Sequence, residues 1–181
     1  MKKILRSKNL EKFAFGSYSY CERIFWLFVN LAPKSFRKIV YKLVFKSFGK
    51  NIFIDEHCYF RYPWKISIGD EVAINRGCEF YPSWRDPNSK IELAFGVILG
   101  PNVTLFGAGQ NPENPKRLDV SSSIVIGENA YIGGNSTIRY GVRIGNNSVI
   151  GAGSVVVTNI PKLTIYAGNP AKSIRKITRK A

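Results

Sequence analysis

Few side chains in this sequence can exchange a proton near neutral pH. His57 is the single histidine, and imidazole ionises closer to pH 7 than any other side chain. A histidine-rich metal site is therefore excluded, and a histidine-dependent mechanism would rest on His57 alone. Glu113 and Asp119 are alternative bases, but a carboxylate works near neutrality only when burial raises its pKa. For all three residues, an exposed turn or loop position without a chemical role is the competing interpretation.

Composition limits the functional classes further. The chain has 181 residues with 27 Lys and Arg against 12 Asp and Glu, a formal charge of +15. Residues 1–50 hold 12 basic and two acidic residues, residues 51–161 hold nine and ten, and residues 162–181 hold six and none. A neutral body with basic ends argues against wrapping nucleic acid, and no zinc-finger or RNA-binding motif is present. Three cysteines cannot form a disulfide framework, which favours a reducing compartment.

A period of six organises the middle of the chain. It is neither the 3.6-residue period of a helix nor the two-residue period of a strand. It predicts short flat strands joined by turns, three per coil of a triangular prism, with the aliphatic side chains inside and the coils paired in parallel. The aliphatic positions are Ile126, Ile132, Ile138, Ile144, Ile150 and Val156.

The same phase extends back to residue 54, and two stretches interrupt it. Four residues after each aliphatic position, the repeat has a small or β-branched residue that points inward. Cys58 and Cys78 fall on this position, so we assign them to core packing. The interruptions are residues 81–92 and 106–123, the second rich in Gly, Pro and Asn. In so regular an array, interruptions are the natural places for function.

The ends of the chain predict different structure. We expect residues 1–50 to be a basic amphipathic helical segment, residues 51–161 the β-helix with its loop 106–123, and residues 162–181 a basic tail. Apolar residues between Pro33 and Gly49 follow the helical period, with Gly49 as the helix stop, and residues 22–31 are a second helical candidate. After Pro161 we expect a turn and then a short basic helix.

The first residues do not resemble a cleaved signal peptide. The longest fully apolar run, Ile24 to Val29, which extends through Asn30 to Ala32, is shorter than the roughly 20 residues of a membrane span. We therefore expect a cytoplasmic protein. Two roles stay open for residues 1–50. Their apolar face caps the prism, or their basic and aromatic residues make peripheral contact with the inner face of the membrane.

Two motifs make the repeat specific, namely Ile144-Gly-Asn-Asn-Ser-Val-Ile-Gly-Ala-Gly-Ser-Val-Val156 and Ile165-Tyr-Ala-Gly-Asn-Pro-Ala-Lys172. Over about residues 49–176 the chain resembles the hexapeptide-repeat, left-handed β-helix acyltransferases. Within that superfamily it is similar to the maltose, galactoside and exopolysaccharide O-acetyltransferases. The resemblance implies a left-handed parallel β-helix that forms a homotrimer, with active sites between neighbouring subunits.

The resemblance also implies a reaction. Acetyl-CoA serves as co-substrate, without a metal, and a sugar or glycan hydroxyl in surface polysaccharide biosynthesis is the acceptor. A histidine in the long loop removes the hydroxyl proton. At the matching position this chain has Gln110, whose amide can position a hydroxyl but cannot act as a base. Three explanations stay open: an introduced substitution, an enzyme that uses another base, or a non-catalytic relative.

Further residues match family positions. Asn75 stands where an asparagine lines the acceptor site and can donate to the substrate or to a developing oxyanion, although a turn role explains it equally well. Trp84 and Arg85 are candidates to stack on a sugar ring or to pack against a neighbouring subunit, and Glu113 is a further candidate contact to the acceptor. The positions that the resemblance assigns to coenzyme A are Tyr131, Gly133, Gly134, Ala152, Gly153, Thr158, Lys172 and Arg175.

The sequence therefore predicts an acetyl-CoA-dependent sugar O-acetyltransferase with Gln110 in place of the expected histidine. Two alternatives stay open, a non-catalytic β-helix scaffold and an amino-sugar N-acetyltransferase. The γ-type carbonic anhydrases use the same prism but need three zinc-binding histidines, so the single histidine excludes them.

Overall fold

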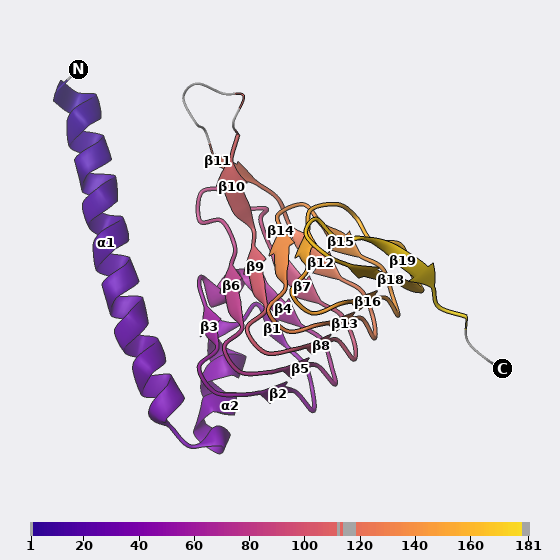
Figure 1. Cartoon of the computed structure of the whole chain (residues 1–181). Coiled ribbons are helices and arrows are strands. Elements are labelled where there is room, and N and C mark those ends of the chain that lie inside the picture. Colours follow the sequence, from indigo (N-terminus) through magenta and orange to yellow (C-terminus); the bar gives the residue numbers. More distant parts are fainter. Residues whose placement is uncertain (1, 112, 114–118, 179–181) are drawn as a thin grey trace. The chain divides into compact units, whose positions relative to one another are not determined.

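The computed structural model describes residues 2–111, 113 and 119–178, with the backbone alone for residues 2–15 and 119. The chain divides into two compact units, Met1–Val40 and Tyr41–Ala181 (Figure 1). The first unit is helical, and the second is built almost wholly of short strands.

Two helices, α1 (Lys2–Leu31) and α2 (Lys34–Val44), begin the chain. Helix α1 is much longer than the predicted helix at residues 22–31. Pro33 stands just before α2, where its missing amide hydrogen costs no helical hydrogen bond, and its carbonyl accepts from the Arg37 amide at 3.1 Å. Within α1, the Tyr18 hydroxyl donates to Glu22 Oε1 at 3.0 Å, a contact between residues one helical turn apart.

The second unit is a parallel β-helix with three sheets, which confirms the predicted prism. As far as β17 the chain visits sheets A, B and C in turn, so each sheet stacks one strand from each of these coils. Sheet A contains β1 (Ser47–Phe48), β4 (Ile66–Ile68), β7 (Ile91–Leu93), β12 (Ile124–Ile126) and β15 (Arg143–Ile144). Sheet B contains β2 (Phe53–Ile54), β5 (Ala73–Ile74), β8 (Ile98–Leu99), β13 (Tyr131–Ile132), β16 (Val149–Ile150), β18 (Thr164–Ala167) and β19 (Lys172–Lys176). Sheet C contains β3 (Tyr59–Phe60), β6 (Glu79–Tyr81), β9 (Thr104–Phe106), β14 (Thr137–Arg139) and β17 (Val155–Val156).

The aliphatic positions of the six-residue repeat form the core, as predicted. Ile132, Ile138 and Val156 are fully buried, and each stacks on the equivalent residue of a neighbouring coil. The small residues four positions after each aliphatic residue are also buried, and the serines among them hydrogen-bond their hydroxyls to nearby backbone groups. Ser148 Oγ donates to the Gly145 carbonyl at 2.6 Å, for example, which removes the cost of a buried polar group.

Cys58 and Cys78 are buried in the same stack, which agrees with their assignment to packing. Their thiols donate to the carbonyls of Asn75 and Gly100 in the adjacent coils, at 3.3 and 3.2 Å. The hydrogen bond with Cys78 and burial raise the pKa of the Cys58 thiol well above its ordinary value. We therefore expect no thiolate chemistry at Cys58.

The two interruptions of the repeat both leave the prism after a strand of sheet C and return to sheet A. The first follows β6 and the second follows β9. The second contains a projecting antiparallel hairpin made of β10 (Ala108–Gln110) and β11 (Asp119–Ser121) (Figure 1). A short 3₁₀ turn, η1 (Pro63–Lys65), follows β3 at the same corner, one coil before the first insertion.

The helix predicted to run to Gly49 ends at Val44, so this boundary was wrong. Ser47 and Phe48 form β1, and the amides of Lys46 and Gly49 donate to the carbonyls of Ile66 and Ile68 at 3.1 and 3.0 Å. Strand β4 would otherwise leave these carbonyls unpaired at the start of sheet A. A Cβ on Gly49 would lie 2.6 Å from the Gly69 carbonyl carbon, so close approach of two coils explains this glycine.

The basic helix expected after Pro161 is also wrong. Residues 164–167 form β18, residues 172–176 form β19, and the two strands pair antiparallel at the end of sheet B. The backbone groups of β18 need partners after the last coil, and β19 supplies them. The predicted tail therefore belongs in part to the β-helix. The bond between Asn169 and Pro170 is cis.

We expect Ile138→Ala to lower the free energy of unfolding by about 2–5 kcal/mol, because the lost methyl groups leave a cavity in a fully buried stack. Urea denaturation at one fixed chain concentration measures this. The matched control is Ile98→Ala, since Ile98 is 42% exposed on the outside of β8. Equal losses for both variants would contradict the assignment of Ile138 to the core.

Candidate functional site

The corner between sheets B and C carries much of the predicted site. Here one turn of every coil stacks on the next, and backbone hydrogen bonds run along the stack. The amide of Gly77 donates to the Glu56 carbonyl at 3.2 Å, and that of Gly153 donates to the Gly134 carbonyl at 2.8 Å. The predicted site residues on this corner are His57, Asn75, Gly133, Gly134, Ala152 and Gly153.

Asn75 is half-buried immediately after β5. Its side-chain Nδ2 donates to the Leu99 carbonyl of the next coil at 2.6 Å, and its backbone amide donates to the same oxygen at 3.1 Å. One of the two carboxamide N–H groups thus ties neighbouring coils together. This contact gives Asn75 the structural role that the sequence offered as one of two interpretations.

His57 is exposed and has a φ of 59°. Asn102 and Asn135 occupy the same left-handed turn conformation in later coils of this corner, with φ of 57°. The conformation of His57 is therefore the one that the prism requires of its turns. His57 lies one coil from Asn75, because β2 pairs directly with β5.

Farther along the stack, small residues at this corner let neighbouring coils approach each other closely. A Cβ on Gly133 would lie 2.8 Å from Ala152 Cα, and one on Gly134 would lie 2.9 Å from the Pro101 carbonyl oxygen. Both glycines are therefore required by the contact between coils. At Gly153 a Cβ would meet no atom within 4 Å, so the space beside this exposed residue is open.

The corner between sheets C and A carries the second group of predicted residues. Gln110 is exposed at the end of β10 and lies opposite Asp119 in the hairpin register. Glu113 is also exposed, and its backbone amide donates to Asn111 Oδ1 at 3.0 Å. The side chain of Asp119, proposed as an alternative base, lies outside the described residues. Thr158 is exposed at the same corner, two residues beyond the end of β17.

The first insertion is fixed by Lys65. Its ammonium donates to the carbonyls of Ser83 and Asp86 at 2.5 and 2.6 Å. Burial lowers the pKa of this ammonium, and the nearby Asp86 carboxylate opposes that effect. Asp86 Oδ2 also accepts from Ser121 Oγ in β11 at 3.1 Å, so the insertion is joined to the base of the hairpin.

Trp84 and Arg85 project from this insertion and are both exposed. The Arg85 guanidinium lies 5.5 Å from the centre of the Trp84 ring, within cation–π range. A flat aromatic face beside a cation suits contact with a polyhydroxyl ring, and it suits packing against another protein equally well.

A group of aromatic and basic residues beside the hairpin was not among the predicted site residues. Tyr81 and Phe106 stack with ring centres 5.4 Å apart and an interplanar angle of 10°, and Arg139 continues their row on sheet C. A Cβ on Gly109 would lie 3.2 Å from Tyr140 Cδ1, so the Tyr140 ring covers the strand that carries Gln110. The repeat could have indicated this group. The outward position directly after an inward residue is occupied in successive coils by Tyr81, Phe106 and Arg139.

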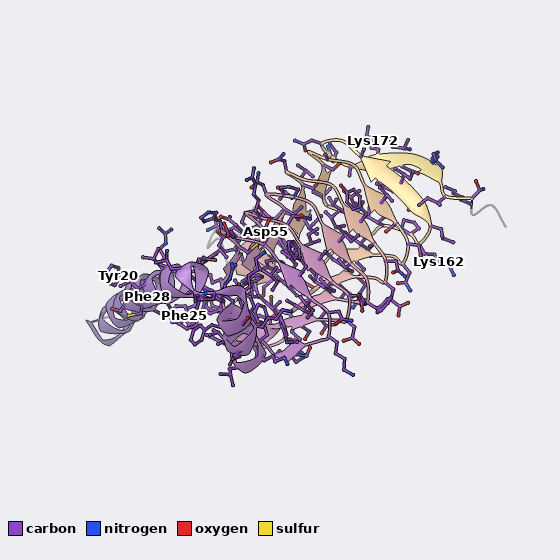
Figure 2. The ribbon with its side chains drawn as sticks, turned by 90° about the horizontal axis from the view of Figure 1, so that it is seen from below. Tyr20, Phe25, Phe28, Asp55, Lys162 and Lys172 are labelled. Carbon is purple, nitrogen blue, oxygen red and sulfur yellow. The ribbon has the colours of Figure 1, made fainter. Side chains whose placement is uncertain are left out.

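The remaining residues assigned to coenzyme A lie along sheet B. Tyr131 is 44% exposed on β13, between Ile98 and Val149 of the neighbouring strands. Lys172 and Arg175 are exposed on β19. Figure 2 shows Lys172 and Lys162 toward the end of the prism that is farther from Asp55.

One chain does not bring all these residues together. Asn75 and the small-residue column belong to the corner between sheets B and C, whereas Gln110, Trp84 and Arg85 belong to the corner between sheets C and A. Sheet C separates the two groups. Among the residues whose positions the structure describes, no group of three His, Cys, Asp or Glu is arranged to hold a metal ion.

Comparison with known proteins identifies the family. Residues 123–158 match the model of the bacterial transferase hexapeptide (six repeats). The galactoside O-acetyltransferase of Escherichia coli (strain K12) is 34% identical over 144 residues, which are 78% of this chain and 68% of the relative. The chain belongs to the hexapeptide-repeat acetyltransferase superfamily. The galactoside O-acetyltransferase of Lactococcus lactis (strain IL1403) is 33% identical over 75% of this chain, but the match spans only 65% of that relative.

Solved structures support the same family assignment. A maltose O-acetyltransferase from Clostridium difficile 630 superposes with a TM-score of 0.78 and 32% identity, covering 89% of this chain and 86% of that one. A galactoside acetyltransferase in complex with coenzyme A superposes with a TM-score of 0.74 and 29% identity, covering 88% and 80%.

Lys65→Met should loosen the insertion that carries Trp84 and Arg85, because two carbonyls lose their charged donor. We expect amide hydrogen exchange over residues 83–89 to speed up by about 5- to 150-fold, from a local loss of roughly 1–3 kcal/mol. Lys90→Met is the matched control, since it makes the same substitution at a lysine within the insertion itself. Unchanged exchange in Lys65→Met would show that the insertion does not depend on this contact.

Proposed function

We propose that this protein transfers an acetyl group from acetyl-CoA to a hydroxyl of a sugar or glycan in surface polysaccharide biosynthesis. The observation that carries the proposal is the hexapeptide prism with its hairpin at Gln110, in a chain related to galactoside and maltose O-acetyltransferases. The aromatic faces of Tyr81, Phe106 and Trp84 near this hairpin support a sugar acceptor.

The proposed donor fits the corner between sheets B and C. An extended pantetheine arm needs a backbone surface without projecting side chains, and Ala152 and Gly153 are exposed there beside open space. Lys172 and Arg175, exposed on β19, supply positive charge for the phosphates of a strongly anionic cofactor. Tyr131, Gly133, Gly134 and Thr158 remain proposed contacts.

The thioester supplies an activated acyl carbon, so no covalent enzyme intermediate is needed. The acceptor oxygen forms a bond to this carbon, the carbon–sulfur bond breaks, and coenzyme A leaves as a thiolate. The hydroxyl proton must pass to a base, from which it can reach that thiolate. Gln110 would orient the hydroxyl through hydrogen bonds, and Asn75 would donate to the oxygen that gains charge. The Gln110 carboxamide cannot take the proton, so in this chain the proton passes to water, His57, Glu113 or another carboxylate.

We also propose that the prism is left-handed and assembles as a homotrimer. This proposal follows from the resemblance, and the separation of Gln110 from Asn75 within one chain supports it, because a neighbouring prism can bring the two corners together. Because acetyl-CoA is a cytoplasmic metabolite, we place the reaction in the cytoplasm. The alternatives remain a scaffold without chemistry and an amino-sugar N-acetyltransferase.

Gln110→His should raise acetyl transfer by about 10²- to 10⁴-fold, the usual contribution of a general base. The gain should increase with pH through the ordinary imidazole pKa of about 6.5, because only the neutral ring accepts a proton. Chromatographic detection of acetylated maltose, galactosides and amino sugars measures the gain and separates O- from N-transfer.

Asn111→His is the matched control, because it places the same ring one residue away from the proposed position. A trimer that neither binds acetyl-CoA nor gains activity from Gln110→His would overturn the enzymatic proposal in favour of the scaffold.

Replacing Lys172 and Arg175 together with Ala should weaken coenzyme A binding by roughly 5- to 30-fold, since each exposed charge contributes up to about 1 kcal/mol. Isothermal titration calorimetry measures the dissociation constant, and Lys162→Ala controls for the loss of positive charge at the same end of the prism. The same affinity in the double variant and in the control would remove these residues from the cofactor site.

A further inference from the structure

Helix α1 carries an exposed apolar stripe that the proposed reaction does not use. At 100° per residue, its members fall within an arc of roughly 100° on one side of the helix. They are between 39% and 75% exposed. The stripe consists of Tyr20, Ile24, Leu27, Phe28 and Leu31. Figure 2 shows Tyr20 and Phe28 on this helix, with Phe25 nearby.

The stripe is distinct from the buried side of the same helix. Glu22, Trp26 and Val29 are buried, and they lie roughly opposite the stripe on the helical wheel. Packing within the chain therefore explains one side of α1 and leaves the other unexplained. A contiguous exposed apolar patch of this kind marks an interaction surface.

Helix α2 repeats the combination of exposed apolar and basic residues. Phe36, Ile39 and Leu43 are between 54% and 79% exposed and follow the spacing i, i+3, i+7. The same helix exposes Lys34, Lys38 and Lys42. Long lysine side chains beside an apolar stripe are typical of helices that lie in the headgroup region of a bilayer.

We propose that the helical segment, residues 2–44, binds the surface of an anionic lipid bilayer, with the apolar stripe of α1 inserted among the lipids. Charge selects this partner. Residues 1–50 hold 12 basic and two acidic residues, and each basic residue close to an anionic surface strengthens the attraction to it. The binding is peripheral, because none of the described helices is long and apolar enough to cross a membrane.

The same charge disfavours a second copy of this chain as the partner. Two identical segments would bring together two surfaces that are each strongly positive, whereas anionic headgroups neutralise the charge. Peripheral attachment would also raise the local concentration of the enzyme around acceptors held at the membrane.

Vesicle flotation of the full chain tests the proposal. We expect at least about 10-fold tighter binding to vesicles with 30% phosphatidylglycerol than to phosphatidylcholine alone, and a loss of that binding in 0.5 M salt. The double variant Leu27→Glu, Leu31→Glu should bind at least about 10-fold less. Phe95→Glu with Ile174→Glu is the matched control, because both residues are exposed, apolar and outside the helices.

Cys21 gives a second measurement that does not depend on a charge substitution. It lies at the edge of the stripe and is the exposed one of the three cysteines, since Cys58 and Cys78 are buried. A solvent-sensitive dye attached at Cys21 should shift to shorter wavelength and brighten at least twofold with anionic vesicles. Circular dichroism checks that each variant keeps its fold.

Equal binding to neutral and anionic vesicles, an unchanged dye, or equal binding by the stripe variant and its control would each overturn the proposal. So would a fall in oligomer mass in Leu27→Glu, Leu31→Glu without a change in vesicle binding, because the stripe would then be a contact between copies. Acetyl transfer by the chain in detergent-free buffer is measured separately, so a failure here leaves the proposed function intact.

Discussion

The close stacking of successive coils is the constraint on which the rest of the structure depends. Parallel strands lie about 4.8 Å apart, so each turn must fit between the turns above and below it. A Cβ on Gly145 would lie 2.8 Å from Lys162 Cα, and one on Gly100 would lie 3.0 Å from Gly134 Cα. Glycine at such positions lets the backbones touch, and the inward aliphatic residues then stack without gaps.

This spacing also decides where the chain can carry function. Strands of two or three residues are stable only because each coil pairs with its neighbours, so an interruption inside a strand would break the stack. Both insertions therefore leave at one corner, between sheets C and A. There Lys65 ties the first insertion to the preceding coil, and Ser121 joins that insertion to the hairpin that presents Gln110. The chemically varied part of the molecule is held by a few polar contacts on a regular prism.

The prism also keeps apart groups that the proposed reaction needs together. Asn75 and the open space beside Gly153 lie on one corner, whereas Gln110 and the Tyr81–Phe106 stack lie on or beyond sheet C. A rigid stack cannot fold one corner onto the other. Assembly of several prisms solves this problem physically, which links the proposed activity to the proposed trimer.

The period of six by itself determined the prism and its buried residues, because each coil repeats a local pattern. It also determined the packing role of Cys58 and Cys78 and the position of both insertions. Pairing between distant segments was decided only by the tertiary structure. Residues 172–176 form a strand because β18 needs partners, Ser47 and Phe48 leave the helix because β4 needs partners, and Lys65 reaches carbonyls about 20 residues away. These choices depend on backbone groups left unpaired elsewhere in the fold, which no local pattern records.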